Sequence, residues 1–349
     1  MNFISEVACP NPIHFWKTVK CLNKKRTASF SAITENGNIH TTPEEILNCL
    51  QDHFSSRFTA PILNMNNSTD VLASKLWNEL SSSSHKDIKL ACENSALKFT
   101  AQDVKLIIRK MNTKNSSGFD KHTMTCLKVH TGTRSGSKPE QYVLTNKICK
   151  NLFLLRFNKW LELNNVLPTQ QSGSRPHLST LTRVNHLMEQ LTQSLRHNSF
   201  SVLVYIDFLQ AFDMLWHPGL ILKLQHVHCP YAYLCWIVNY FQDRTTTIDY
   251  QGHLSDQIVI TRGAPQGSCF GPKAYIVNLF DLPQIFECTP KLHLYVDDLA
   301  LLYSPSIYLK YIKQTDEIQT RINNDMVKLE QYADNNHQPV NKNKMEFVV

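Results

Sequence analysis

Two adjacent acids interrupt an apolar run at residues 292–302, which read Leu-His-Leu-Tyr-Val-Asp-Asp-Leu-Ala-Leu-Leu. The apolar residues on either side predict two strands, with Asp297 and Asp298 at a hairpin turn between them. Because Asp tolerates turn conformations, the pair could simply form the turn. Two carboxylates at the edge of an apolar layer nevertheless repel each other and are costly to desolvate, and a divalent cation relieves both effects. This stretch alone supports a plain turn and a metal site equally.

A third acid follows another apolar run, where residues 201–207 read Ser-Val-Leu-Val-Tyr-Ile-Asp. The run predicts a strand buried on both faces, with Asp207 at its C-terminal end. If this strand neighbours the hairpin in one sheet, three carboxylates converge on one edge. Such a group can hold two cations about 4 Å apart, an arrangement that stabilises the attacking and leaving oxygens in phosphoryl transfer. The three acids together therefore predict a metal-dependent phosphoryl-transfer site.

Three turn-rich loops carry residues that suit phosphate groups. Residues 114–121 hold a glycine between lysines, residues 167–176 end in Arg175 and Pro176, and residues 262–268 contain Gly263 and Gly267. Basic side chains there would supply cations for a triphosphate or a nucleic-acid backbone, and the glycines would let the backbone pass close to a flat ligand. The plainer interpretation of each loop is a surface turn.

Helices and strands of ordinary length must position these residues. Thr42 is a candidate cap for a helix over residues 43–58, and Thr100 with Asp103 three residues later predicts another helix start. A helix capped by Ser179 or Thr180 has an apolar stripe that predicts core packing, formed by Leu181, Val184, Met188, Leu191 and Leu195. Further helices are expected around residues 148–155 and 234–241, from the 262–268 loop through Phe280, and over 316–332; further strands are expected at 245–250, 257–261 and 345–349.

The composition is that of a globular protein. The chain has 349 residues, roughly two domains' worth, with 42% hydrophobic and 19% charged residues. No apolar run approaches the roughly 18 residues of a membrane helix, and the first residues lack a signal-peptide pattern. These features predict an intracellular protein that does not enter a membrane, with its ten cysteines reduced. The net charge of +7 mildly favours an anionic partner.

The order of these motifs resembles the reverse transcriptases of non-LTR (LINE-like, jockey-type) retrotransposons over most of the chain. The resemblance implies an α+β fold with the right-hand polymerase architecture of fingers and palm, an antiparallel palm sheet packed on helices. It also implies an N-terminal extension at residues 1–97 and a polymerase domain at 98–349, with fingers at about 98–199 and palm at about 200–349. Residues 295–298 match the YxDD box, and residues 204–213 match the first acidic motif. The PQGS box is matched by residues 263–268 with Gly271 and Pro272, and the SPGPDG segment by residues 117–120. The fingers motif is matched by Gln171, Gly173 and Arg175 with Ser179 and Thr180, and the lysine motif by Asn341 with Lys344.

The function that the resemblance implies is RNA-directed DNA polymerase. Such an enzyme joins deoxynucleoside triphosphates to the 3′-hydroxyl of a DNA primer on an RNA template, using two Mg²⁺ ions for which Mn²⁺ can substitute. Asp207, Asp297 and the backbone carbonyl of Phe208 would bind the metal ions. Asp298 would be a further metal ligand or an electrostatic partner.

The resemblance also implies a nucleotide-binding set. Phe212 would lie under the incoming sugar and exclude a 2′-hydroxyl, and Gln266 with Gly267 would contact the nucleotide. Arg175 would grip the triphosphate, and Lys344 would donate a proton to the leaving pyrophosphate. Each has a plainer alternative: Phe212 as a core aromatic, Lys344 as a solvated lysine and Arg175 as a loop charge. Asp213 stays unassigned between a cap or ion-pair acid and a catalytic acid.

Several departures from the family pattern point to weaker activity. The stretch between Lys128 and Lys147 is short, and Val143 stands where an arginine is expected. Ser174 replaces an aromatic, and Tyr332 stands where tryptophan is expected. The chain stops after the lysine motif, so the thumb is expected to be absent, and an endonuclease domain before the polymerase segment is not expected either. The alternative function is therefore a catalytically weak or inactive palm-fold remnant that only binds nucleic acid. An unrelated metal phosphotransferase would require the motif matches to be chance.

Overall fold

The computed structural model describes residues 30–35, 37–83, 99–110, 141–196, 200–265, 267–286, 291–306 and 308–349. These residues belong to two compact units. The first takes the residues up to Ser56 together with Thr245–Ile258, and the second takes Arg57–Arg244 and Val259–Val349. The predicted domain division at residue 97 falls in a stretch outside the described residues and stays a prediction. Helix α4 (Ser68–Ser81), which precedes that division, belongs to the second unit.

The first unit is small and built on two hairpins and a helix. Strands β1 (Ile33–Glu35) and β2 (Asn38–His40) pair, as do β5 (Asp249–Tyr250) and β6 (His253–Leu254). Helix α3 (Pro43–Phe58) starts at the predicted cap, where the Thr42 hydroxyl accepts from the amide of Glu45 at 3.3 Å and the Glu45 carboxylate accepts from the amide of Thr42 at 3.3 Å. The predicted strand at 245–250 is broken into β4 (Arg244–Thr246) and β5, whereas β7 (Ile258–Ile260) lies where a strand was expected.

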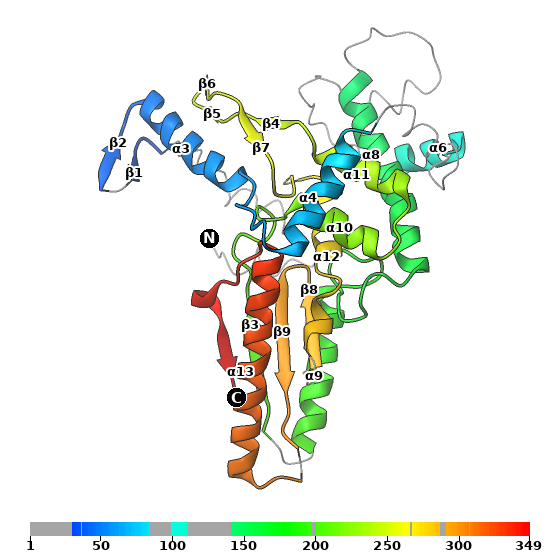
Figure 1. The fold of residues 1–349 in the computed structure, drawn as a ribbon, viewed down its shortest axis with the longest axis vertical. Coiled ribbons are helices and arrows are strands. Elements are labelled where there is room, and N and C mark those ends of the chain that lie inside the picture. The colour runs from blue at the N-terminus through cyan, green and yellow to red at the C-terminus, as the bar shows by residue number, and fades with distance from the viewer. Residues whose placement is uncertain are drawn as a thin grey trace, which may run out of the picture. The chain divides into compact units, whose positions relative to one another are not determined.

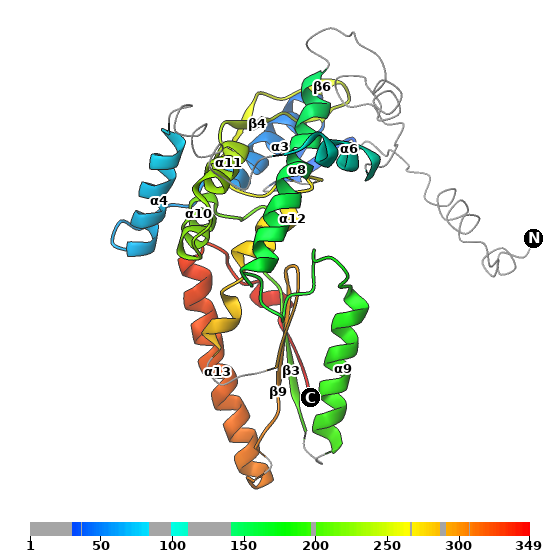
Figure 2. The same ribbon diagram turned by 90° about the vertical axis from the view of Figure 1, so that its right-hand side faces the viewer.

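The second unit contains a four-stranded antiparallel sheet with a helix on each face (Figures 1 and 2). The strand order is β10 (Glu346–Val348), β3 (Val202–Ile206), β9 (Asp298–Tyr303), β8 (Lys291–Tyr295). On one face Val204 and Leu301 are fully buried in the same core as Ile318 of α13 (Tyr311–Asn335). On the other face lies α9 (Thr180–Arg196). The predicted antiparallel sheet packed on helices is thus present.

Strand β3 is buried on both faces over most of its length, as predicted, with one exception. Leu203 is covered by α9, but Tyr205 on the same face is 39% exposed. The reason is that α9 covers the β8 side of this face and leaves the end of β3 near Asp207 open. The open end of that face is the place where the functional residues gather.

The prediction that the apolar stripe of α9 packs in the core is wrong for three of its five positions. Leu181, Val184 and Met188 are 67%, 47% and 55% exposed. The side of the helix that packs on the sheet carries Leu187 and, from the predicted stripe, Leu191. Side-chain periodicity shows that a helix has an apolar stripe, but the neighbouring sheet determines which part of the stripe is covered. The side chain of Leu195 lies outside the described set.

The described residues of the second unit form further helices. They are α4, α6 (Ala101–Lys110), α8 (Gln141–Leu163), α10 (His217–His226), α11 (Tyr231–Phe241) and α12 (Gly271–Asn278). Phe153 of α8 stacks on Trp236 of α11 with ring centroids 3.6 Å apart, and both meet Phe270 edge-on at the start of α12. The predicted start of α6 is confirmed, since the Thr100 hydroxyl and the Asp103 carboxylate bond each other's backbone amides. These contacts anchor the beginning of α12 and so the loop that precedes it.

A buried lysine joins helices α10, α12 and α13. The ammonium of Lys223 donates to the Asp281 carboxylate at 2.7 Å, the Asn278 carbonyl at 2.7 Å and the hydroxyl of Tyr332 at 2.8 Å. Burial lowers the pKa of Lys223, and the nearby Asp281 opposes that shift. Tyr332, which stands where the family has tryptophan, therefore has a use for its hydroxyl in this chain.

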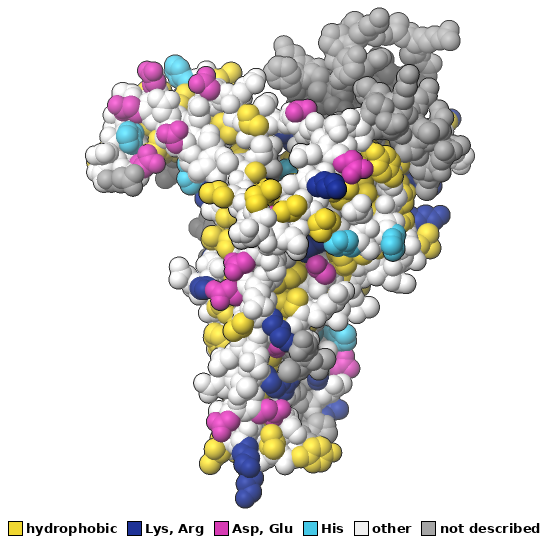
Figure 3. All heavy atoms as spheres, in the orientation of Figure 1, with side chains coloured by type: hydrophobic (Ala, Val, Ile, Leu, Met, Phe, Trp, Pro, Cys, Tyr) yellow, Lys and Arg dark blue, Asp and Glu magenta, His cyan; other side chains and the backbone are white. Residues whose placement is uncertain are grey.

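Three further features concern the surface charges, the length of the apolar helices and the cysteine thiols. In the face seen in Figure 3, acidic and basic side chains are interspersed over the sheet and its helices. None of the helices in the described ranges is both long and apolar enough to cross a bilayer. Among the described residues, the cysteines at positions 49, 149 and 229 have thiols outside any disulfide.

Candidate metal and nucleotide site

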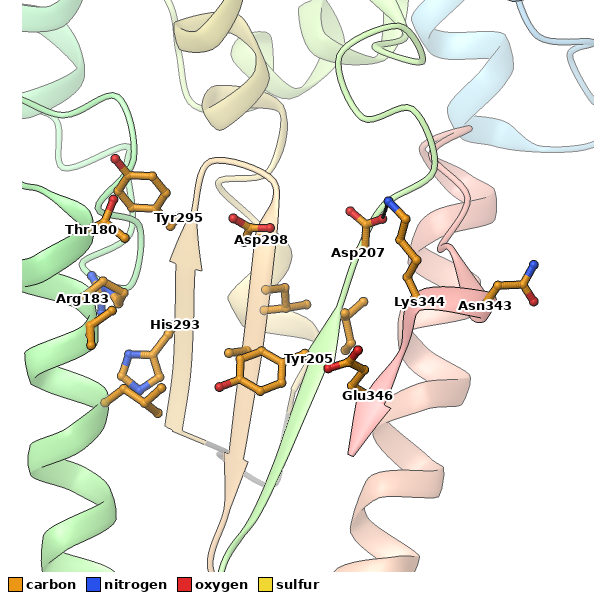
Figure 4. A pocket seen from close by; sticks show the side chains of 15 residues that line it. Thr180, Arg183, Tyr205, Asp207, His293, Tyr295, Asp298, Asn343, Lys344 and Glu346 are labelled. Atoms are coloured by element: carbon orange, nitrogen blue, oxygen red, sulfur yellow. Dashed lines mark ion pairs between the residues drawn. The ribbon is translucent and has the colours of Figure 1, made fainter. Parts of the chain in front are cut away.

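The three predicted acids meet at one end of the sheet. Ile206 of β3 pairs with Leu299 of β9, so Asp207 and Asp298 are the next facing positions along the same ladder. Facing residues of antiparallel strands have Cα atoms about 5 Å apart. Figure 4 shows both carboxylates at the same end of the two strands. Asp297 precedes Asp298 directly in the two-residue turn between β8 and β9, so the expected convergence is confirmed.

The acids oppose one another electrostatically. Burial raises the pKa of Asp297, and the negative charges of Asp298 and Asp207 raise it further. The pKa of Tyr275 is well above its usual value because the ring is buried and because Asp297 and Asp207 lie near it. These carboxylates offer the hard oxygen donors that divalent cations take, and a bound cation would relieve the repulsion that raises the Asp297 pKa. The donor set therefore fits a divalent metal ion.

The turn that carries Asp297 has a strained backbone. Val296 has a φ of 62°, in the left-handed region that β-branched residues rarely adopt. Such a conformation costs on the order of 1–3 kcal/mol and persists only when the surroundings hold it in place. Backbone strain of this kind, in a turn that also carries a half-buried acid, is typical of functional sites.

Asp207 is also contacted by the lysine motif. The ammonium of Lys344, at the end of the 3₁₀ helix η2 (Lys342–Lys344), lies 3.1 Å from the Asp207 carboxylate, and the Asn341 side-chain amide donates to it at 3.3 Å. The Asp207 carbonyl accepts from the amide of Asn341 at 2.8 Å. The Lys344 side chain is 69% exposed, so it is solvated as its plainer interpretation has it, yet it lies at the site.

Phe208 lies between two ladder bonds. The Leu209 amide donates to the Pro339 carbonyl at 2.8 Å, and the Asp207 carbonyl takes the Asn341 amide, so Phe208 and Val340 form a non-hydrogen-bonded pair. The pairing bonds therefore do not use the Phe208 carbonyl, which suits its predicted role as a metal ligand.

Phe212 packs beside the acids and beneath the PQGS loop. Its ring stacks on Tyr275 with centroids 5.0 Å apart, and its carbonyl accepts from the Ala264 amide at 2.7 Å. Gly263 has a φ of 93°, and a Cβ there would lie 2.9 Å from the Asp213 carbonyl, so this position requires glycine. Gly267 is exposed with a φ of 74°, and Gln266 lies outside the described residues.

Arg175 is engaged by the end of helix α8 and by its own loop. Its guanidinium lies 3.1 Å from the Glu162 carboxylate and donates to the Pro168 carbonyl at 3.0 Å. A second arginine, which the motif comparison missed, faces the site: Arg183 donates to the Ser172 hydroxyl at 2.9 and 2.6 Å and to the Thr169 carbonyl at 2.9 Å. Arg183 lies one turn into α9, on the same side as the capping Ser179, and this spacing is the feature of the sequence that could have indicated it.

An open hollow of about 600 Å³ joins these residues on the uncovered sheet face (Figure 4). Asp207, Asp298 and Lys344 line one end, and Arg183 and His293 line the other. Tyr205, the exposed residue of β3, forms part of the floor between them. The hollow thus places basic and aromatic side chains beside the acids.

Two segments singled out by the sequence remain, one of them wholly and the other largely outside the described residues. Residues 117–120 and the shortened stretch from Lys128 to residue 140 lie outside the described residues. Tyr142 and Val143 belong to the first turn of helix α8, so this part of the stretch is helical.

A family model described as "Reverse transcriptase (RNA-dependent DNA polymerase)" matches residues 139–349. The chain belongs to this family. The match covers both acidic segments, the PQGS loop and the lysine motif, and it confirms the resemblance found in the sequence. The acids therefore meet within the region that defines the family.

Curated relatives come from mobile elements of Drosophila melanogaster. The "Probable RNA-directed DNA polymerase from transposon BS" is 24% identical over 339 residues, which is 83% of this chain and 36% of the relative. The "RNA-directed DNA polymerase from mobile element jockey" is 29% identical over 162 residues, 45% of this chain and 18% of the relative. The chain thus spans about a third or less of the relatives' length. An apo telomerase structure from Candida tropicalis matches at a TM-score of 0.40 and 13% identity, over 61% of this chain and 44% of that one, too low to bear on the fold.

Proposed function

We propose that this chain is the fingers and palm part of a mobile-element reverse transcriptase, which joins deoxynucleotides to a DNA primer on an RNA template. The observation that carries the proposal is the convergence of Asp207, Asp297 and Asp298 at one end of an antiparallel sheet. The palm would comprise the sheet with α12 and α13, and the fingers would comprise residues from about 98 to 199. The protein would act inside the cell, where its template and nucleotides are.

Two Mg²⁺ ions would be held by Asp207, Asp297 and the Phe208 carbonyl, with Asp298 as a further ligand or electrostatic partner. Mn²⁺ would substitute. When bound, such ions make the primer hydroxyl more nucleophilic and neutralise charge on the phosphates. Support comes from the pKa of Asp297, which is raised first by burial and then by the charges of Asp298 and Asp207; a bound cation would offset both causes.

The protein's own residues would select and orient the nucleotide. Phe212, held on Tyr275, would exclude a 2′-hydroxyl and so favour deoxynucleotides. Gln266 and Gly267 would contact the nucleotide. Lys344 would protonate the leaving pyrophosphate, a role for which an exposed ammonium beside Asp207 is well placed. Arg175 would reach the triphosphate only after releasing Glu162.

The test is primer extension on an RNA template with Mg²⁺ and all four deoxynucleoside triphosphates. The wild type is expected to extend the primer, and Asp207→Asn is expected to lose at least about 100-fold of the rate, as expected when a metal ligand is removed. Glu330→Gln is a matched control because Glu330 is 58% exposed in an ion pair with Lys342. Extension by Asp207→Asn at the wild-type rate would refute the proposal.

One observation favours the alternative of a remnant that only binds nucleic acid. The cationic groups meant for phosphates are already paired with acids, Arg175 with Glu162 and Lys344 with Asp207. Thermal unfolding with and without Mn²⁺ separates the two functions. Stabilisation of the wild type that Asp297→Ala abolishes supports catalysis, because only the folded site binds the ion. A chain that binds primer–template but is indifferent to Mn²⁺ supports the remnant.

A further inference from the structure

One buried side-chain amide takes both backbone polar groups of Val296, the residue before Asp297. The Gln171 Oε1 atom accepts from the Val296 amide at 2.9 Å, and its Nε2 atom donates to the Val296 carbonyl at 3.2 Å. Gln171 is 1% exposed. A glutamine side chain can make this pair of bonds because its amide carries an acceptor and donors together.

The clamped residue is the strained one. Val296 has the left-handed φ of 62° that its branched side chain disfavours, so the turn would relax if nothing held it. Gln171 holds the amide and the carbonyl of that same residue. Because Asp297 is the next residue, the direction of its carboxylate depends on the backbone that Gln171 holds.

Gln171 is itself fixed by its own segment. The Ser172 amide donates to the Leu294 carbonyl at 3.0 Å, and the Leu294 amide donates to the Gln170 carbonyl at 3.0 Å, so the segment runs alongside β8. The Gly173 amide donates to Gln171 Oε1 at 2.7 Å. The clamp therefore connects a segment before α9 to the turn of the acidic hairpin.

The geometry assigns Gln171 as a positioning residue, whose amide holds the Val296 turn in the conformation that directs Asp297 into the metal site. The assignment rests on the proposed function. Gln171 is buried and bonds the turn, so it would act on metal and nucleotide only through the turn. Loss of the clamp should therefore weaken metal use and slow the chemical step more than it weakens nucleotide binding.

The experiment compares Gln171→Met, which keeps the side-chain length and removes both bonds, with Gln170→Met as the matched control. The Gln170 side chain accepts from its neighbour Thr169 and does not bond the turn in the described contacts. Single-nucleotide incorporation is measured against Mg²⁺ and against nucleotide concentration, with thermal unfolding of each variant. Gln171→Met is expected to lower kcat about 10- to 100-fold, raise the Mg²⁺ half-saturation several-fold and change the nucleotide KM less than about threefold. Gln170→Met is expected to match the wild type.

Two further measurements keep the outcome decisive. Gln171→Glu retains the acceptor and loses the donor, so it is expected to show the same defects, and it replaces the Met variant if that one does not fold. If the wild type itself incorporates no nucleotide, the proposed function fails, and Mn²⁺ affinity by electron paramagnetic resonance then tests the clamp separately. Wild-type kcat with wild-type metal half-saturation in Gln171→Met, or equal Mn²⁺ affinity where there is no activity, would overturn the assignment.

Discussion

Replacing Gly173 by alanine should disturb the acidic turn right beside the amide clamp. A Cβ at Gly173 would collide with the Val296 amide nitrogen and side chain and would lie 3.0 Å from Gln171 Oε1. Gly173 does not have a left-handed φ, so glycine is needed here for space and not for its conformational freedom. The contacted atoms include the backbone of a turn that is already strained, which leaves little room for relaxation.

The expected size follows from these contacts. Inserting a methylene-sized group into a packed site costs about 1–3 kcal/mol, and we expect about 2 kcal/mol from Gly173→Ala. Displacing reacting groups by about 1 Å can cost about 100-fold in rate, so primer extension should fall by at least that factor. Urea unfolding and single-nucleotide incorporation measure the two effects.

Gly252→Ala is the matched control. Gly252 has a φ of 86° and open space around its Cβ position, in the other compact unit. An alanine there is expected to cost about 1 kcal/mol through backbone conformation alone and to leave incorporation unchanged. The reasoning fails if Gly173→Ala has the wild-type free energy of unfolding and incorporates nucleotide at the wild-type rate. It also fails if the variant loses stability but keeps full activity.

Three further outcomes are expected. Asp297→Asn removes a charge that burial and its acidic neighbours disfavour, so the free energy of unfolding in urea without metal should rise by about 1 kcal/mol. The same variant should lose nucleotide incorporation. A variant less stable than the wild type would contradict this prediction. Lys344→Gln should slow incorporation about 10- to 100-fold without shifting the melting temperature, since its ion pair is exposed; an unchanged rate would exclude proton donation. Burial lowers the pKa of His217 from 6.5 to about 4. The positive charge of Arg244 also lowers this pKa, whereas the hydrogen bond to the Gly263 carbonyl raises it. The unfolded chain then binds this proton at a higher pH than the folded one, so the unfolding free energy should fall by about 2 kcal/mol from about pH 8 to about pH 5. His217→Gln should reduce that fall, and an identical pH profile would contradict the assignment.

Local sequence patterns predicted that each acid lies at a strand end, because this placement depends only on short-range features; the pairing of the strands was an added assumption. Apolar runs that end in acids place Asp207, Asp297 and Asp298 at strand ends, and pairing of the two strands then brings them together. The helix starts at Thr42 and Thr100 were also predictable, since a capping box involves residues three apart.

The features that sequence reasoning missed depend on long-range packing. The stripe on α9 has a helical period, but which of its residues meet the sheet depends on how the helix lies, and Met188 is 55% exposed. The use of Gln171 as a clamp depends on which segment runs beside β8. The pairing of Arg175 with Glu162 joins a loop to the end of the preceding helix, which no local motif indicates.

The most direct test of the central claim is the position of bound metal. Crystals soaked with Mn²⁺ and a deoxynucleoside triphosphate should show anomalous density touching the carboxylates of Asp207 and Asp297, with Lys344 displaced from Asp207. Anomalous peaks elsewhere, or none at these acids while the nucleotide is bound, would contradict the assignment of the three carboxylates to metal binding and nucleotide joining.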